Sequence, residues 1–175
     1  MKKTFACLVI VSLISVFMMS AATFPSSEGK LFNDQAFTFP DDLVSDKHIV
    51  IALTLSSSRK NGEVQQEAFI TWQQELAGLI TEEMIYHIVV IDGAPFFVRG
   101  AIRSGLAQSY ETIIDPAQGG VLFLSKAQRL ASQAGIPIDG EPTLVVLSAQ
   151  NTIAGFVKGS YTQQRKEQLL ELLEQ

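Results

Sequence analysis

Cysteine is nearly absent from this chain of 175 residues, which contains one, Cys7, inside its first apolar run. The thiolate is the reactive species in cysteine chemistry, so a chain without cysteine can neither exchange disulfides nor reduce peroxides through a thiol. If the first apolar run is removed on maturation, the working protein has no thiol. Cysteine-based redox catalysis is then excluded.

The chain also lacks an excess of positive charge and a cluster of metal ligands. The chain carries 13 Lys and Arg against 18 Asp and Glu, which argues against nucleic acid or an anionic membrane surface as the partner. The two histidines, His48 and His87, have no His, Cys or paired carboxylate at metal-ligand spacing. Gly-rich phosphate-binding motifs are absent. We therefore predict no metal and no other cofactor.

The first 22 residues have the pattern of an export signal. A basic start at Lys2 and Lys3 precedes an apolar run over residues 5–19, and Ser20-Ala21-Ala22 provides a small-x-small end. The run is shorter than the roughly 20 residues that span a bilayer, so cleavage near Ala22 is favoured over a retained anchor. We expect an exported, periplasmic protein with a Sec-type signal and no stable membrane insertion after cleavage.

Removal of residues 1–22 leaves 153 residues with 11 basic and 18 acidic side chains, a net charge of −7. That length suits one domain with a sizeable core. Residues 23–36 are polar, rich in turn-forming residues and without periodicity, so they are predicted to form a flexible N-terminal arm. The remainder, residues 37–175, is predicted to be a single domain.

A parallel β-α-β unit is predicted near the start of that domain. Residues 48–55 and 86–91 are β-branched and apolar, as is typical of strands buried on both faces. A helix over residues 63–80 connects them, and a crossover of this kind implies parallel strands. Residues 37–40 form a short edge strand and turn, because Pro40 cannot donate a ladder hydrogen bond. The apolar stripe of the helix is predicted to consist of Phe69, Trp72, Leu76, Leu79 and Ile80.

The middle of the chain is predicted to contain two further helices. Residues 96–108 form the first, and a short strand over residues 111–114 follows it, with a turn at Gly119-Gly120. Ser125 is the predicted N-cap of a small helix that ends at Gly135.

The last forty residues predict a hairpin and a terminal helix. Residues 143–147 and 152–157 are apolar and β-rich with a tight polar connection, so they pair as antiparallel strands. Ser160 and Gln163 have the spacing of a capping box at the start of the final helix.

This order of elements resembles the thioredoxin-like superfamily, and the resemblance covers roughly residues 35–175. Its best local piece is a short helix that leads to Gly140-Glu-Pro142-Thr143, then a strand, a polar turn, a second strand and a glycine. The resemblance implies an α/β fold with a central mixed sheet and flanking helices. It also implies a cis peptide bond at Glu141-Pro142, facing the loop that carries the redox site in the family.

The sequence departs from the family at the reactive position itself. The redox cysteines belong at the end of the first buried strand, where this chain has Thr54-Leu55-Ser56-Ser57-Ser58-Arg59. A serine hydroxyl cannot form a disulfide and is not ionised near neutral pH. The resemblance therefore points to a branch without redox cysteines. A weaker similarity, through residues 97–106 and the C-terminal hairpin and helix, points to thioredoxin-like ATP synthase assembly factors and uncharacterised exported bacterial proteins.

The loop after the first buried strand is the main candidate site. Backbone N–H groups at a helix N-terminus, with Arg59 and Lys60, could bind an anion or a partner's carboxylate. By the resemblance, the turn before the hairpin lies across a groove from this loop and pairs with an extended peptide. We predict a non-catalytic protein that binds a peptide or protein segment as an accessory or assembly factor. The predicted binding residues are Ser56, Ser57, Ser58, Arg59, Glu141, Pro142 and Thr143.

Other interpretations of the same residues stay open at the level of sequence. The loop could belong to an enzyme that works without cysteine, although no reaction can be named. A trio of Ser57, His87 and Asp92 has no Gly-x-Ser-x-Gly motif to support a hydrolase. Both halves of the groove could be purely architectural, with the interaction surface elsewhere, for example over residues 96–103. Within that segment Arg99 and Arg103 lie one helical turn apart and could form a small basic patch.

Overall fold

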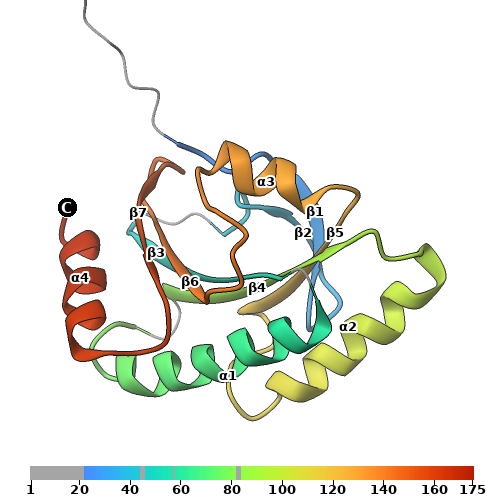
Figure 1. The fold of residues 1–175 in the computed structure, drawn as a ribbon, viewed down its shortest axis with the longest axis horizontal. Coiled ribbons are helices and arrows are strands. Elements are labelled where there is room, and N and C mark those ends of the chain that lie inside the picture. Colours follow the sequence, from blue (N-terminus) through green and yellow to red (C-terminus); the bar gives the residue numbers. More distant parts are fainter. Residues whose placement is uncertain (1–21, 44–45, 57, 82–83) are drawn as a thin grey trace, which may run out of the picture.

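We describe residues 22–43, 46–56, 58–81 and 84–175 from a computed structural model of the chain. The predicted signal sequence falls almost entirely outside these residues, as does Ser57. Within them, seven strands form one mixed sheet, with helices packed on both of its faces (Figure 1). The strands are β1 (Ser27–Leu31), β2 (Ala36–Phe39), β3 (Ile49–Leu55), β4 (Ile85–Asp92), β5 (Gly119–Leu124), β6 (Thr143–Leu147) and β7 (Ile153–Lys158). The helices are α1 (Arg59–Leu76), α2 (Phe96–Tyr110), α3 (Ala127–Gln133) and α4 (Gln163–Leu173).

The sheet has the strand order β2-β1-β5-β4-β3-β6-β7. Strands β3, β4 and β5 run parallel, whereas β6 and β7 continue the sheet antiparallel on one side and β1 and β2 on the other. Helix α3 covers one face, and α1, α2 and α4 cover the other (Figure 1). The carboxyl ends of β3 and β4 therefore meet at one edge of the sheet, beside the N-terminus of α1. This layout confirms the α/β sheet predicted from the sequence.

The predicted β-α-β unit is confirmed, with shifted helix ends. Every residue of β3 is buried, as expected for a strand covered on both faces. Helix α1 begins at Arg59 because the Ser58 side chain caps it, and it ends at Leu76, whereas the predicted range was 63–80. Leu79 consequently lies beyond the helix and is 54% exposed, so its predicted place on the apolar stripe is wrong.

The flexible arm predicted over residues 23–36 is wrong. The segment contains β1, which pairs with both β2 and β5 and so lies inside the sheet. Phe24 is buried and packs edge-on against the ring of Phe39, with 4.9 Å between the ring centroids. The apolar residues that anchor the segment lie among polar ones at irregular spacing, which is why no periodicity is visible. The edge strand predicted over residues 37–40 is confirmed as β2.

The segment between α2 and α3 also differs from its prediction. Residues 111–114 form turns, not a strand, and the predicted turn at Gly119-Gly120 is the buried start of β5. The physical reason is close packing. A side chain at Gly119 would collide with the ring of Phe32 and approach Ile114 to 2.9 Å, so the strand can pass there only without one.

The C-terminal prediction is confirmed in outline. Strands β6 and β7 form the expected hairpin, and α4 follows it. The capping residues are displaced, because Thr162 and not Ser160 accepts the hydrogen bond from the N–H of Arg165. Helix α3 likewise begins after Lys126, one residue later than the predicted cap. No helix in the described ranges has the length and apolar character that a bilayer crossing needs.

Candidate binding site at the carboxyl edge of the sheet

The predicted loop lies where β3 passes into α1. Ser58 has extended backbone angles, and its hydroxyl accepts a hydrogen bond from the N–H of Asn61 at 3.2 Å. Arg59 forms an ion pair of 2.9 Å with Glu63, one turn further along α1, and its side chain is 92% exposed. Since an exposed pair of this type is worth little, Arg59 stays available to a ligand at small cost.

Gln65 holds the end of β3 in place. Its side chain is completely buried, accepts a hydrogen bond from the Leu55 N–H at 3.2 Å, and donates to the Leu55 carbonyl at 3.0 Å. Its amide also donates to the side-chain oxygen of Asn61 at 2.9 Å. Sequence periodicity placed Gln65 off the apolar stripe, yet it lies four residues before Phe69 and so shares that face.

Asn61 links the loop to the turn before β6. Its amide donates to the Gly140 carbonyl at 2.9 Å, so the two halves of the predicted groove are brought together. The cis peptide bond expected at Glu141-Pro142 is not present; within the described residues it is Phe39-Pro40 that is cis. Gly140, at a φ of +85°, reverses the chain before Glu141, so the turn is made with the ordinary trans form at Pro142.

The turn from Glu141 to Thr143 has few free backbone groups. The Glu141 N–H donates to the Asp139 carboxylate at 3.1 Å, and the Pro142 carbonyl accepts from the Gly159 N–H at 2.8 Å. Thr143 pairs with β3 on one side and with β7 on the other. Pro142 and Thr143 are buried and Glu141 is exposed. Strand addition at this turn would have to displace existing hydrogen bonds.

An open pocket of about 790 Å³ lies on the other side of the loop, between α1 and α2. Ser56, Ser58 and Arg59 line it, whereas residues 141–143 do not. The ends of β3 and β4 form its base, and α2 forms its opposite wall. The structure therefore assembles three of the seven predicted site residues into a cavity together with a helix that the groove prediction did not include. We call this cavity the α1–α2 pocket.

Two buried residues that carry hydroxyl groups are among those that line the α1–α2 pocket. Thr54 is 4% exposed and Tyr110 is 1% exposed, and both line the cavity. Burial raises the pKa of the Tyr110 phenol well above its usual range, and the neighbouring Thr54 hydroxyl offsets part of that rise. The phenol therefore stays protonated at physiological pH, which does not suit a base.

The histidine of the hypothetical Ser-His-Asp trio is a buried structural group. His87 is 1% exposed, its Nε2 lies 3.2 Å from the side-chain oxygen of Gln73, and its ring packs near those of Phe69 and Tyr110. Burial lowers the pKa of the imidazole to about 4. His87 does not line the α1–α2 pocket, whereas Asp92 does. Across the described ranges, no group of three or more His, Cys, Asp or Glu side chains could hold a metal ion.

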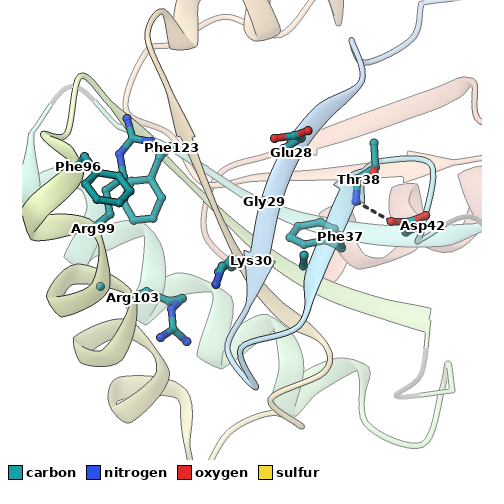
Figure 2. A pocket seen from close by; sticks show the side chains of 12 residues that line it. Glu28, Gly29, Lys30, Phe37, Thr38, Asp42, Phe96, Arg99, Arg103 and Phe123 are labelled. Carbon is teal, nitrogen blue, oxygen red and sulfur yellow. Dashed lines mark hydrogen bonds between the residues drawn. The ribbon is translucent and has the colours of Figure 1, made fainter.

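Helix α2 has a second cavity on its other flank, about 770 Å³ in volume, between the helix and the β1–β2 hairpin (Figure 2). Arg99 lies over the Phe123 ring, 5.3 Å from its centroid, and donates to the Ala94 carbonyl at 3.0 Å. Arg103 is paired with Asp34 at 2.6 Å. Both arginines are thus engaged within the protein. The most exposed large apolar side chains of the described segments stand at the start of this helix: Phe96 is 86% exposed and Phe97 is 84% exposed.

Comparisons with known proteins identify the fold of this chain, but they do not identify its family or its function. No protein-family model matches the chain, and no curated protein matches it. A putative electron transfer protein from Aquifex aeolicus VF5 superposes with a TM-score of 0.61 at 15% identity, over 89% of this chain and 97% of that one. BsSco, a member of the Sco family of cytochrome c oxidase assembly proteins, gives a TM-score of 0.59 at 6% identity, over 87% and 92% of the two chains.

A third similar solved structure is a thioredoxin domain. The thioredoxin domain of a thiol-disulfide oxidoreductase from Bacteroides vulgatus superposes with a TM-score of 0.53 at 9% identity, over 89% of this chain and 99% of that domain. The protein therefore has the thioredoxin-like fold, as the sequence resemblance predicted. Its single cysteine, Cys7, lies far in sequence from the end of β3, where the chain has serine.

Proposed function

We propose that this protein is an exported, non-redox member of the thioredoxin-like group that binds a protein segment, as an accessory or assembly factor. The binding site in this proposal is the α1–α2 pocket, with Ser56, Ser58 and Arg59 at its rim. The turn from Glu141 to Thr143 supports the rim from the other side through the bond between Asn61 and Gly140.

The observation that carries the proposal is the exposed aromatic start of α2 beside a cavity whose lining is partly apolar and partly polar. Phe97 lies one helical turn before Ala101, which lines the α1–α2 pocket, so both residues are on the same flank of the helix. Large aromatic side chains this exposed are unfavourable in water and are characteristic of surfaces that bind other proteins. A bound segment would cover Phe97 and place one of its own side chains in the cavity.

Catalysis receives no comparable support. The titratable group at the base of the pocket, Tyr110, is held neutral by burial, which suits neither a general base nor a nucleophile. The buried His87 is bonded to Gln73 and is outside the pocket. A binding site needs only the shape and the hydrogen-bonding groups that the pocket provides.

Export rests on the sequence of residues 1–22. The basic start, short apolar run and small-x-small end fit a cleaved signal, and cleavage after Ala22 would leave Thr23 as the first residue. The buried Phe24 would then remain part of the mature protein and keep β1 anchored.

Two glycines of α2 provide a matched test of where a segment binds. Gly105 lines the α1–α2 pocket and Gly100 lines the cavity on the other flank, and a Cβ added to either would meet no atom within 4 Å. The Cβ of Gly105→Leu therefore meets no clash, and the remainder of the leucine side chain should occupy part of the α1–α2 pocket. Gly100→Leu is the control, because it adds the same side chain to the same helix on its opposite flank.

The experiment is selection of a phage-displayed random dodecapeptide library on immobilised residues 23–175, followed by affinity measurement with the enriched peptides by fluorescence polarisation. We expect enriched sequences whose Kd rises at least tenfold with Gly105→Leu and changes less than twofold with Gly100→Leu. Failure to enrich any sequence above a blank surface would overturn the proposal. Equal losses with the two leucine variants would overturn the assignment to this pocket.

A further inference from the structure

The outer side of strand β7 is unpaired over the second half of the strand. β7 ends the strand order of the sheet, so β6 is its partner on one side only. The Gly159 N–H donates to the Pro142 carbonyl at 2.8 Å, one step beyond the register pair of Thr143 and Lys158. Because hydrogen-bonded and non-hydrogen-bonded pairs alternate in an antiparallel ladder, Phe156 and Lys158 form non-hydrogen-bonded pairs with β6. Their backbone N–H and C=O groups therefore point away from the sheet.

No hydrogen bond from another described residue reaches these outward groups. At the start of the strand, by contrast, the Ile153 N–H donates to the Ala22 carbonyl at 2.8 Å. The one charge of β7 does not protect the open part, because the Lys158 ammonium is bonded to the Asp139 carboxylate at 2.6 Å and to the Pro137 carbonyl at 3.2 Å. An edge strand without a projecting charge or a proline is suited to pairing with another strand.

Phe156 adds exposed apolar surface to the same edge. Its side chain is 38% exposed, and it is the strand residue among the large apolar side chains that the described ranges expose. The β-bulge of the hairpin lies between Ile153 and Gly155, so β7 is regular from Gly155 to its end. The edge therefore offers a short regular backbone with an aromatic ring beside it.

Helix α4 packs beside β7 and has an unusual order of charges (Figure 1). It follows the strand after a short turn at residues 159–162, so it runs in the opposite direction. Arg165 and Lys166 lie at its start and Glu171 and Glu174 at its end, which is the reverse of what the helix dipole favours. None of these four side chains forms an ion pair with another described residue. Opposite charges from outside the chain would stabilise this arrangement.

We propose that two copies of this chain pair through β7 in antiparallel orientation and form a two-fold symmetric dimer with one continuous sheet. Phe156 of each copy lies opposite Lys158 of the other, and each of these pairs exchanges two backbone hydrogen bonds. This register uses both outward-facing residues of each strand. Because the same surface is used in both copies, the assembly closes at two chains. The Phe156 ring covers the methylene groups of Lys158 in the second copy, since opposite residues share a face of the sheet.

The two-fold relation also accounts for the charges of α4. The symmetry axis is perpendicular to the sheet, so the two α4 helices lie on the same face and run in opposite directions. The basic start of each helix then lies towards the acidic end of the other, Arg165 towards Glu171 of the second copy. This charge complementarity favours a second copy over an unrelated strand as the occupant of the edge.

Sedimentation equilibrium on residues 23–175 tests the dimer, for which we expect a Kd on the order of 10 μM. Phe156→Lys places a second cation beside Lys158 of the other copy and should raise this Kd at least tenfold. Phe97→Lys is the matched control, because it makes the same change at an exposed phenylalanine of α2, and it should stay within twofold. Thermal unfolding verifies that both variants fold.

Charge reversal on α4 tests the orientation of the two copies. Arg165→Glu and Glu171→Arg should each raise the Kd about threefold to tenfold, and the double variant should return to within about twofold of the wild type. Amide hydrogen exchange of Phe156 and Lys158, followed by NMR, should slow in concentrated samples relative to dilute ones.

A chain that stays monomeric at about 1 mM would overturn the inference. Equal losses with the two lysine variants would overturn the assignment to β7, as would a dimer in which the amides of Phe156 and Lys158 gain no protection. A double variant no better than the single ones would overturn the antiparallel arrangement of the α4 helices. The proposed binding of a segment at the α1–α2 pocket is tested separately and does not depend on these outcomes.

Discussion

The side-chain amide of Gln65 hydrogen-bonds both backbone groups of Leu55, accepting from its N–H at 3.2 Å and donating to its carbonyl at 3.0 Å. The register explains why a side chain is needed there. The last pair between β3 and β6 is Leu53 with Thr143, so Leu55 extends past the end of its neighbour. Gln65 supplies the partner that β6 does not, and it thereby fixes where the loop from Ser56 begins.

Replacing Gln65 by leucine should destabilise the protein by about 2–4 kcal/mol. The change leaves the Leu55 N–H and carbonyl unpaired in a buried position and removes a partner of Asn61. Urea unfolding followed by circular dichroism measures the change in the free energy of unfolding. Gln74→Leu, at an exposed position of the same helix, is the control and should stay within about 0.5 kcal/mol. If Gln65→Leu lowered the free energy of unfolding no more than Gln74→Leu does, the prediction would be wrong, and water would have to hydrogen-bond Leu55 in place of the Gln65 amide.

Stability should fall between about pH 6.5 and pH 4 because of His87. Burial lowers the pKa of its imidazole from 6.5 to about 4 in the folded state, so over this range the unfolded chain binds more protons. The contribution is present in full above pH 6.5 and is lost as the pH falls to 4, to a total of about 3 kcal/mol.

Urea unfolding at half-unit pH intervals measures this dependence. His87→Gln, which cannot titrate, should flatten the slope whatever its effect on stability at pH 7. His48→Gln makes the same substitution at a half-buried histidine and is the matched control for the substitution itself. An unchanged slope in His87→Gln would assign the pH dependence to other groups.

Phe24→Ala should destabilise residues 23–175 by about 3 kcal/mol, because the ring is buried against Phe39. Thr23→Ala, at the exposed neighbouring position, should have an effect below about 0.5 kcal/mol. Thermal and urea unfolding measure both. Equal stability of the two variants would restore the interpretation of residues 23–36 as a loose arm.

Gly119→Ala should cost about 2 kcal/mol or more, because the new methyl group collides with Phe32 and the core must shift. Gly100→Ala should instead stabilise by about 0.5–1 kcal/mol, since it lies in an exposed part of α2 with open space around it. The two substitutions are chemically identical, so opposite signs in urea unfolding would reflect packing alone. A neutral Gly119→Ala would show that Phe32 can move aside.

The mature protein should contain no thiol. If the signal is cleaved after Ala22, the N-terminal sequence of protein recovered from the periplasm starts at Thr23, and reaction with a thiol reagent under denaturing conditions gives no signal. The full-length chain, expressed without export, is the control and gives one thiol per molecule. An exported protein that retains Cys7 would instead be tethered through its apolar run.

The sequence was sufficient for the elements whose pattern is regular and buried. The continuous apolar runs of β3 and β4 and the stripe through Phe69 and Trp72 reveal the β-α-β unit, and the tight connection at residues 148–151 reveals the hairpin. Strand β1 was not predicted from the sequence, because its burial depends on pairing with β5, almost a hundred residues away. A partner so distant in sequence does not affect the local composition from which a strand is predicted.

The candidate site was predictable only in part, for a similar reason. The serine-rich loop was placed correctly at the end of β3, but the wall contributed by α2 depends on how two helices pack. Thr54 and Tyr110 are distant in sequence and become neighbours only in the folded chain. The cis bond expected at Glu141-Pro142 was carried over from the resemblance; the fold is present without it.

At the outer edge of the sheet, the Asp42 carboxylate accepts from the Thr38 N–H at 2.6 Å, and the Asp42 N–H donates to the Thr38 carbonyl at 2.9 Å. One residue therefore occupies both hydrogen-bonding groups of an edge-strand position, and it carries a negative charge. A β-strand from a second molecule finds neither a donor nor an acceptor at Thr38 and meets a carboxylate instead. The aromatic rings exposed at the start of α2 thus coexist with a sheet edge that, at Thr38, resists self-assembly into extended β-structure.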